Sequence, residues 1–469
     1  MWNILLNELR SYSRNRSFLL ISIVFLLFLC LSIYLGKLQT NSQNEYYETA
    51  KNELRQQWEK IDDVNPHRAA HYGTYVFKKA NLLSSLDEGV NSVTGNVLRV
   101  EGHVQNEIVH SEASQMQIAS KFGKLKSSLL LQYILPLMLF FLAYNSITNE
   151  KQSGRLKLLA LQGATISSLV WAKTLSVWFY SVLLLALTIL AYSLLNLFTI
   201  TTDIAIRSML LFAAYAMFYF VISGLTVYFT MAWKNSAVAL TSMLALWIMW
   251  TIFLPSILMT SVEKWHQLPS RNTFEVAMKN DRSKGIDGHN PADERGKTLA
   301  QQILTEYGVD SLSQLPINFD GIRMQADEEY GYIVWDKHFG NLRTILEKQK
   351  QSYQLAGFIN PFVSLQNASM GFASSDNLHH SEFLIQVEEY RRDFIKKLND
   401  KHAFGGSKTG DWGWRADNEF YRSIPDFEYQ MTSLVKILPK YFIDLFLLVF
   451  WSILVSTLLF LGIKKINLL

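Results

Sequence analysis

The chain has 469 residues, of which 49% are hydrophobic and only 18% are charged. This balance is too apolar for a typical soluble protein and too polar for a protein built only of membrane spans, so we expect membrane and water-soluble parts in one chain. The net charge of +4 is slight, and no Lys/Arg tract is interleaved with aromatic residues, so nucleic-acid binding has little support. The single cysteine, Cys30, lies in an apolar run, which excludes an intramolecular disulfide.

Six stretches are mostly apolar over the roughly 20 residues that a helix needs to cross a bilayer, and the last of them is uncharged from Leu445 to Ile463. Helices are expected there because an unpaired backbone amide in lipid is costly. The fold class is therefore predicted to be mainly α, a polytopic membrane protein with six transmembrane helices. The predicted spans are residues 18–36, 127–147, 174–200, 208–233, 235–262 and 439–463.

The first of these spans also fits a cleavable signal peptide, because basic residues precede it. Its apolar run reaches spanning length, and no convincing small-x-small cleavage site follows before Lys37. We therefore expect an uncleaved anchor.

The short flanks of the spans fix the expected orientation, because Lys and Arg prefer the cytoplasmic side. Basic residues occur in the amphipathic N-terminus 1–17, the link 148–173, the link at Lys234 and the tail 464–469. All four fall on one side. Both termini are then cytoplasmic, and two large domains, 37–126 and 263–438, lie outside.

The outer domains are predicted to be mostly helical insertions with little sheet. The stretch from Gln39 to Lys60 is polar and free of Gly and Pro, so it predicts a helix that continues from the first span. Further helices are expected over 323–353 and 381–402. Gly, Asp and Ser predict loops at 281–296 and 403–413, the second followed closely by Trp414.

The sequence lacks the common motifs of nucleotide-binding and hydrolytic sites. It contains no Gly-x-x-x-x-Gly-Lys-Ser/Thr loop to hold phosphates, no Gly-x-Ser-x-Gly elbow and no His-Glu-x-x-His pair. We therefore expect that this chain is not an enzyme and carries no cofactor. If ATP drives it, another chain binds the nucleotide.

His67 and His71 are four residues apart in Asn-Pro-His-Arg-Ala-Ala-His. If Pro66 starts a helix, both rings reach one face and can share a metal ion. Two histidines do not complete a tetrahedral shell, and packing at a helix start is the commoner role, so no metal is expected. Missing ligands would have to come by tertiary proximity from a set of distant histidines: His103, His110, His379 and His380.

Polar residues interrupt the apolar surface of the second and fifth predicted spans. Polar groups in lipid turn toward the bundle interior, so these two spans are candidates to line a pathway or a subunit interface. Simple helix packing, with the aromatic rings at headgroup level, is an equal alternative. The candidate residues are Gln132, Tyr133, Pro136, Asn145, Trp247 and Trp250. In the last span, Asp444 is expected to pair with Lys440.

The link 148–173 joins the second and third spans on the side expected to be cytoplasmic. It predicts a short amphipathic helix, with Leu156 and Leu159 on one face and Arg155 off it. Gly163 is expected to end that helix, and Thr165 to cap the next one. From these residues alone, a helix that receives a cytoplasmic partner and an inert interfacial helix are equally open.

The link carries a pattern that resembles the Glu-x-x-x-Gly-Thr-Leu-x-Leu-Leu loop of ABC-2 type transporter permeases, with Arg155 in place of Thr. The matching residues are Glu150, Gly154, Leu156, Leu158, Leu159, Gly163, Ser167 and Lys173. The resemblance covers the membrane bundle, about half of the chain. It implies six spans in each half, two halves in a dimer, and a coupling helix at this link that docks on an ATPase.

The outer segment from 65 to 106 resembles that of a bacterial subgroup related to permeases for the maturation of multicopper enzymes. These resemblances imply a location in the bacterial inner membrane. They imply as partners two copies of an ABC ATPase that hold ATP and Mg, a second permease copy or a sister permease, and membrane lipid.

Three functions from different classes are compatible with these sequence features and resemblances. The first is the permease subunit of an ABC exporter. The second is a mechanotransmitting subunit, in which ATP hydrolysis changes the shape of the outer domains to act on an envelope or periplasmic protein and nothing crosses the membrane. A third, a membrane enzyme or receptor, would require a catalytic or sensing site that the sequence does not display. A channel lined by 132–145 and 237–255 would favour export, and a sealed bundle would favour transmission.

Overall fold

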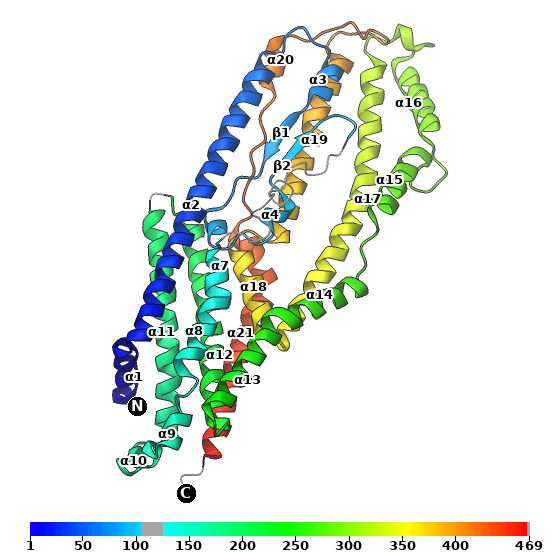
Figure 1. Ribbon diagram of the computed structural model, residues 1–469. Coiled ribbons are helices and arrows are strands. Elements are labelled where there is room, and N and C mark those ends of the chain that lie inside the picture. Colours follow the sequence, from blue (N-terminus) through cyan, green and yellow to red (C-terminus); the bar gives the residue numbers. More distant parts are fainter. Residues whose placement is uncertain (105–124, 198, 467–469) are drawn as a thin grey trace.

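The computed structural model describes residues 1–104, 125–197 and 199–466 (Figure 1). The described residues are mainly helical, as predicted, and their strands are the antiparallel pair β1 (Thr74–Phe77) and β2 (Val97–Val100). Both chain ends lie at one end of the molecule, which we call the proximal end (Figure 1). The opposite end is called the distal end.

Six helices among the described residues are long and apolar enough to cross a membrane, which confirms the predicted number. Each coincides with one of the predicted stretches. They are α2 (Arg16–Glu59), the run α7 to α9 (Ser127–Gln152), α11 (Ile166–Leu195), α12 (Thr202–Ala232), the run α13 to α14 (Ser236–Trp265) and α21 (Leu434–Lys464). α12 contacts α8, α11, α13 and α21, so it lies at the centre of the bundle.

The second and fifth of these helices each contain one π-helical turn. In the second, η2 (Leu130–Ile134) lies between α7 (Ser127–Leu129) and α8 (Leu135–Ala143). In the fifth, η3 (Met249–Phe253) lies between α13 (Ser236–Ile248) and α14 (Leu254–Trp265). A proline, Pro136 or Pro255, follows each turn. Because proline has no N–H and clashes with the carbonyl four residues earlier, the helix widens at these two points.

The remaining elements form the two ends of the molecule. At the proximal end lie α1 (Trp2–Arg14), α9 (Thr148–Gln152) and α10 (Arg155–Leu161). The distal domain comprises residues 37–104 and 266–433. Besides the strands it contains α3 (Pro66–Tyr72), η1 (Leu82–Ser85), α4 (Asn91–Thr94), α15 (Arg271–Lys284), α16 (Ala292–Tyr307), η4 (Leu312–Gln314), α17 (Phe319–Leu355), η5 (Ala356–Phe358), α18 (Pro361–Phe372), α19 (Asn377–Phe404) and α20 (Asn418–Ser423).

The long helices of the distal domain agree with the sequence. α2 is a single helix of 44 residues that leaves the bundle and reaches the distal end (Figure 1). The helices expected over 323–353 and 381–402 lie within α17 and α19. The loop predicted over 281–296 is wrong in part, because α15 runs to Lys284 and α16 starts after Pro291 with two acidic residues in its first turn, a favourable helix start.

A separate apolar core stabilises the distal domain. It joins the far end of α2, α3, both strands, α19 and the segment 416–424, with Trp58 and Phe394 in contact at its centre. The indole of Trp58 donates a hydrogen bond to the carbonyl of Tyr421, 2.8 Å away. Segments more than 350 residues apart in sequence are therefore packed as one unit.

α18 lies within the residue bounds of the distal domain but departs from the expected domain 263–438, because it packs into the bundle core rather than against the apolar core of the distal domain. Its buried residues, among them Phe362 and Phe372, belong to the same apolar core as α12 and α21. With 12 residues it is too short to cross a bilayer, so a search for spanning stretches does not detect it.

Asp444 also departs from expectation. Lys440 pairs with Glu347 of α17 instead, and the fully buried Asp444 accepts hydrogen bonds from Gln354 at 2.6 Å and from Asn367 at 3.3 Å. The α17–α18 segment supplies these partners. Its contact with α21 joins segments that are distant in sequence, so residue spacing within α21 could not predict it.

Candidate functional site

The link between the second and third spans forms two short helices at the proximal end, α9 and α10 (Figure 1). Gly154 separates them with a φ of +71°. α10 ends in a Schellman motif, in which Gly163 at φ +91° donates to the carbonyl of Ala160 and Ala164 donates to that of Leu159, both at 3.0 Å. Thr165 then caps α11 by accepting from the amide of Ser168 at 3.2 Å. The predicted helix stop and cap are confirmed.

α9 is fixed to the next proximal link, between α12 and α13. Thr148 and Ser236 share a hydrogen bond of 2.7 Å between their hydroxyl oxygens. Gln152 donates to the carbonyl of Lys234 at 2.9 Å, and Lys151 donates to the carbonyl of Met231. A displacement of α9 would therefore be transmitted directly to the start of the fifth span.

Glu150 points inward, to Lys173 of α11. The carboxylate lies 2.8 Å from the ammonium nitrogen, and Glu8 of α1 lies 2.6 Å from the same nitrogen. The Lys173 side chain is only 3% exposed, whereas those of Glu150 and Glu8 are 15% and 22% exposed. One buried cation thus joins α1, α9 and α11. Glu150 is therefore placed to hold the link in position rather than to contact a partner.

α10 presents a mixed surface to solvent. Leu156 is buried, whereas Leu158 is 58% exposed and Leu161 is 85% exposed. These two leucines are three residues apart, so they lie on one face of the helix. The exposed Arg155 starts α10 and donates from its Nε to the hydroxyl of Ser153 at 3.0 Å.

Leu158 was among the predicted coupling residues, but Leu161 was not. The i, i+3 spacing from Leu158 would have found it. Leu159, which was also named, is half-buried, as is Ala160. Leu156 and Leu159, which were predicted to share one face, are thus turned more toward the protein than Leu158 and Leu161.

The candidates for a pathway are used largely for packing within the chain. Gln132 is buried and donates to Tyr215 at 2.9 Å and to Asp87 at 3.2 Å, and Tyr215 is bonded to Ser369 of α18 at 3.0 Å. This polar network joins the second span, α12, α18 and the segment before α4. The network could not be predicted, because Asp87 and Ser369 come from distant segments.

The other pathway candidates are also wholly or partly buried within the chain. Tyr133 accepts from Gln366 at 3.2 Å, and Pro136 is buried. Trp250 is buried against Trp451, and its carbonyl accepts a bond of 2.7 Å from Asn360. Trp247 and Asn145 are half-buried. Four of the six candidates, Gln132, Tyr133, Pro136 and Trp250, are therefore engaged in packing or hydrogen bonds within the chain.

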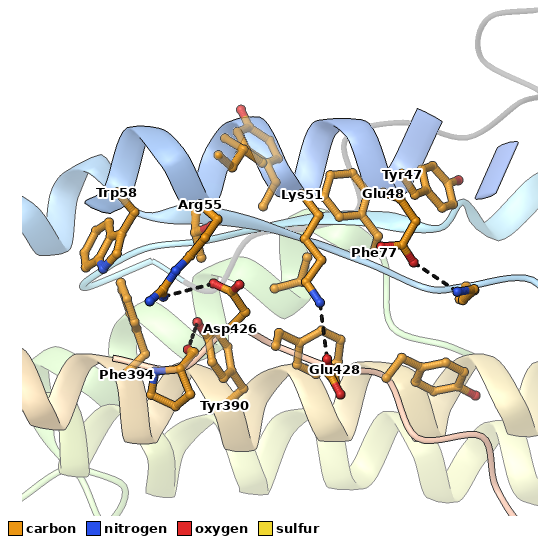
Figure 2. Close-up of a pocket in the computed structure, with 18 of the residues that line it drawn as sticks. Tyr47, Glu48, Lys51, Arg55, Trp58, Phe77, Tyr390, Phe394, Asp426 and Glu428 are labelled. Atoms are coloured by element: carbon orange, nitrogen blue, oxygen red, sulfur yellow. Dashed lines mark hydrogen bonds and ion pairs between the residues drawn. The ribbon is translucent and has the colours of Figure 1, made fainter. Parts of the chain in front are cut away.

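A groove lies in the distal domain between α2 and the segment 424–430 that runs along α19 (Figure 2). It encloses about 220 Å³. Lys51 and Arg55 of α2 point across it to Glu428 and Asp426, at 3.4 and 3.3 Å (Figure 2). Because these charges neutralise each other, the groove acts as a joint between α2 and that segment.

The histidines that were considered as metal ligands separate into two groups among the described residues. His67 and His71 share a face of α3, as the sequence predicted, and His103 lies beside them. His379 and His380 lie elsewhere on α19, where His379 is bonded to Asp376. His110 lies outside the described residues.

The comparisons with known proteins bear on the distal domain. The family model described as a domain of unknown function (DUF3526) matches residues 271–430, which is roughly a third of the chain and includes α15 to α20. No curated protein matches the chain.

Proposed function

We propose that this chain is the membrane permease subunit of an ABC-2 type exporter, and that the α9–α10 link receives force from a separate ATPase. The carrying observation is that α10 presents Leu158, Leu161 and Arg155 outward while Glu150, behind them, is fixed to α11 and α1 through Lys173. An apolar patch beside basic residues, on a short helix that follows the anchored α9, suits docking in a groove of a partner. The resemblance of this link to the coupling loop of ABC-2 permeases supports the same role.

In this mechanism two ATPase subunits grip two copies of the link, one from each permease or from a permease and its sister. Closure of the ATPases on ATP displaces α10. The Glu150–Lys173–Glu8 cluster passes the movement to α11 and α1, and the contacts of α9 pass it to the fifth span. Because most of the pathway candidates are engaged in contacts within one chain, we place the export pathway between the two copies.

Mechanotransmission is the second candidate. The buried network of Gln132, Tyr215, Asp87 and Ser369 supports it, because it connects the bundle to segments that lead into the distal domain. In this alternative no substrate crosses, and the distal domain acts on an envelope partner.

Copurification with a Walker-type ATPase encoded in a neighbouring reading frame tests the docking surface. Leu158→Glu with Leu161→Glu should abolish copurification. The matched control is Val276→Glu on α15, because Val276 is also 58% exposed but lies in the distal domain. Equal recovery of the ATPase with the double variant and with the control would contradict the proposal.

The topology can be tested by labelling intact cells with a membrane-impermeant maleimide, after Cys30 is replaced by Ser. Lys157→Cys on α10 should be labelled only after the membrane is permeabilised, whereas Glu294→Cys on α16 should be labelled in intact cells. Both native side chains are exposed. Labelling of Lys157→Cys in intact cells would overturn the proposed orientation.

A further inference from the structure

Three histidines meet at the distal end of the molecule. His67 and His71 lie one turn apart on α3, and His103 follows β2. Their potential ligand nitrogens all lie within 4.8 Å of one another. The three rings are 4.7 to 5.3 Å apart between centroids.

The local fold builds this cluster from both sides. The side chain of Asn65 caps α3 by accepting from the amide of His67 at 2.9 Å, and Pro66 occupies the first turn. The end of β2 is then fixed to α3 by a bond of 2.9 Å from the amide of Gly102 to the carbonyl of Ala70. This contact places the next residue, His103, beside the two histidines of α3.

The spacing of the two nitrogens contributed by α3 fits a tetrahedral metal ion. Nε2 of His67 lies 3.3 Å from Nε2 of His71. Imidazole nitrogens about 2.0–2.1 Å from Zn²⁺ at tetrahedral angles are about 3.3–3.4 Å apart, whereas adjacent ligands in a square plane would be about 2.9 Å apart. We propose that His67, His71 and His103 form a Zn²⁺ site with three imidazole ligands.

Glu328 of α17 acts as a positioning residue for this site. Its carboxylate oxygen lies 2.9 Å from Nδ1 of His103 and also accepts from the backbone amide of His103 at 2.7 Å. The bond to Nδ1 fixes the ring and leaves Nε2 to bind the metal, the arrangement in which a carboxylate orients a metal-binding histidine. Arg391 of α19 holds Glu328 in turn, at 3.0 Å.

The site opens onto a groove. His67 and His103 line a cavity of about 820 Å³ between α16, α17 and the loop that carries Trp412. The ring of Trp412 lies 5.5 Å from that of His67 and forms one wall. Three protein ligands with an accessible fourth position are the pattern of zinc sites that bind an additional ligand, so the fourth position takes water or a donor atom of a ligand in the groove.

The choice of metal follows from the ligands. Imidazole suits Zn²⁺ and other first-row transition metals, whereas Mg²⁺ and Ca²⁺ prefer oxygen ligands. The site is independent of the proposed export function, since it depends only on the distal domain. Its failure would leave the ATPase-docking proposal untouched, and the reverse also holds.

Zinc binding is tested with the full chain in detergent, purified through a tag without histidine and stripped with a chelator. Competition with a chromophoric chelator should show one Zn²⁺ per chain, and Co²⁺ in its place should give the intense visible absorption of a tetrahedral site. Mg²⁺ and Ca²⁺ should not compete. His71→Ala should weaken Zn²⁺ binding by more than 100-fold, and Glu328→Gln by about 10–100-fold with the stoichiometry kept.

The matched control is His289→Ala, an exposed histidine of the distal domain outside the cluster, which should bind like the wild type. Thermal unfolding of the metal-free proteins checks that the His71 variant is folded. Wild-type protein that binds no Zn²⁺ would overturn the proposal, whatever the variants do. So would equal affinity in the wild type and His71→Ala, or a tetragonal Cu²⁺ site that excludes Zn²⁺.

Discussion

The proximal end and the distal domain both hold buried cations between carboxylates, but with different access to water. At the proximal end, Glu150 and Glu8 are partly exposed around the buried Lys173. In the distal domain, Arg391 contacts Glu328 and Glu388 at 3.0 and 2.9 Å, and all three side chains are at most 8% exposed. A closed cluster is costly to rearrange, whereas one with solvated carboxylates can exchange a partner for water. The distal cluster therefore suits a fixed joint, and the proximal cluster suits a moving one.

The largest effect is expected at the distal joint. Arg391→Met leaves Glu328 buried without its guanidinium partner and leaves Glu388 with Arg392 as a remaining cation, so the free energy of unfolding should fall by about 3–5 kcal/mol. Guanidinium unfolding in detergent, followed by tryptophan fluorescence, measures it. The control is Lys396→Ala, which removes an exposed pair with Asp400 and should cost about 0.3–0.5 kcal/mol. Similar losses in the two variants would remove the contrast between the regions.

Lys78 extends the comparison to a buried cation that, among the residues the structure describes, has no carboxylate in hydrogen-bond contact. Burial lowers its pKa from 10.5 to about 8, partly offset by the charge of Asp376. The ammonium donates to Asn91 at 3.0 Å. Burial lowers the pKa of nearby His380, and the charge of Lys78 lowers it further. The unfolded chain therefore binds more protons than the folded chain between about pH 8 and 10.5, so Lys78 makes stability rise with pH across that window.

Lys78 should contribute about 3 kcal/mol to the rise of the free energy of unfolding with pH. Below pH 8, the destabilisation caused by burying the charged ammonium is fully present. Lys78→Met should remove it. Other groups titrate in the same range. The free energy of unfolding is therefore measured for wild type and variant at pH 7.5 and at pH 10, and the difference between the two proteins is compared at the two pH values. A difference that is constant with pH would show that Lys78 is not held at a lowered pKa.

The proximal cluster should lose less stability than the distal cluster when its cation is removed. Lys173→Met is expected to cost about 1–3 kcal/mol, less than Arg391→Met, because Glu150 and Glu8 can turn to water. The same variant should uncouple ATP hydrolysis from function if the cluster transmits force. A loss of stability as large as that of Arg391→Met would mean that this cluster is also a rigid joint.

In both regions, local patterns follow from the sequence and tertiary contacts do not. The spans and α2 could be predicted because each is a long local pattern, and Gly163 and Thr165 could be placed because a helix end depends on a few neighbouring residues. The partner of a side chain depends on tertiary packing. The inward turn of Glu150 toward Lys173, and the partners that Asp444 takes in place of Lys440, are of that kind.

The histidine cluster shows the same limit. The spacing of His67 and His71 predicted a shared face on a helix that begins at Pro66, which the structure has. It could not predict His103, because only the pairing of β1 with β2 returns the chain to α3. Two ligands were too few to predict a metal, and the third came from a contact between distant segments.

The smallest effect on stability, and the most specific test of coupling, is expected at Arg155. Its side chain is exposed, and its contact with Ser153 is local, so Arg155→Ala should change the free energy of unfolding by less than about 0.5 kcal/mol. If Arg155 contacts the ATPase, permease-stimulated ATP hydrolysis should nevertheless fall. Glu150→Ala should lower both quantities, because it removes a contact inside the protein. The ratio of the two effects thus separates a residue that touches the partner from one that positions the link, and unchanged ATPase stimulation in Arg155→Ala would exclude the first role for Arg155.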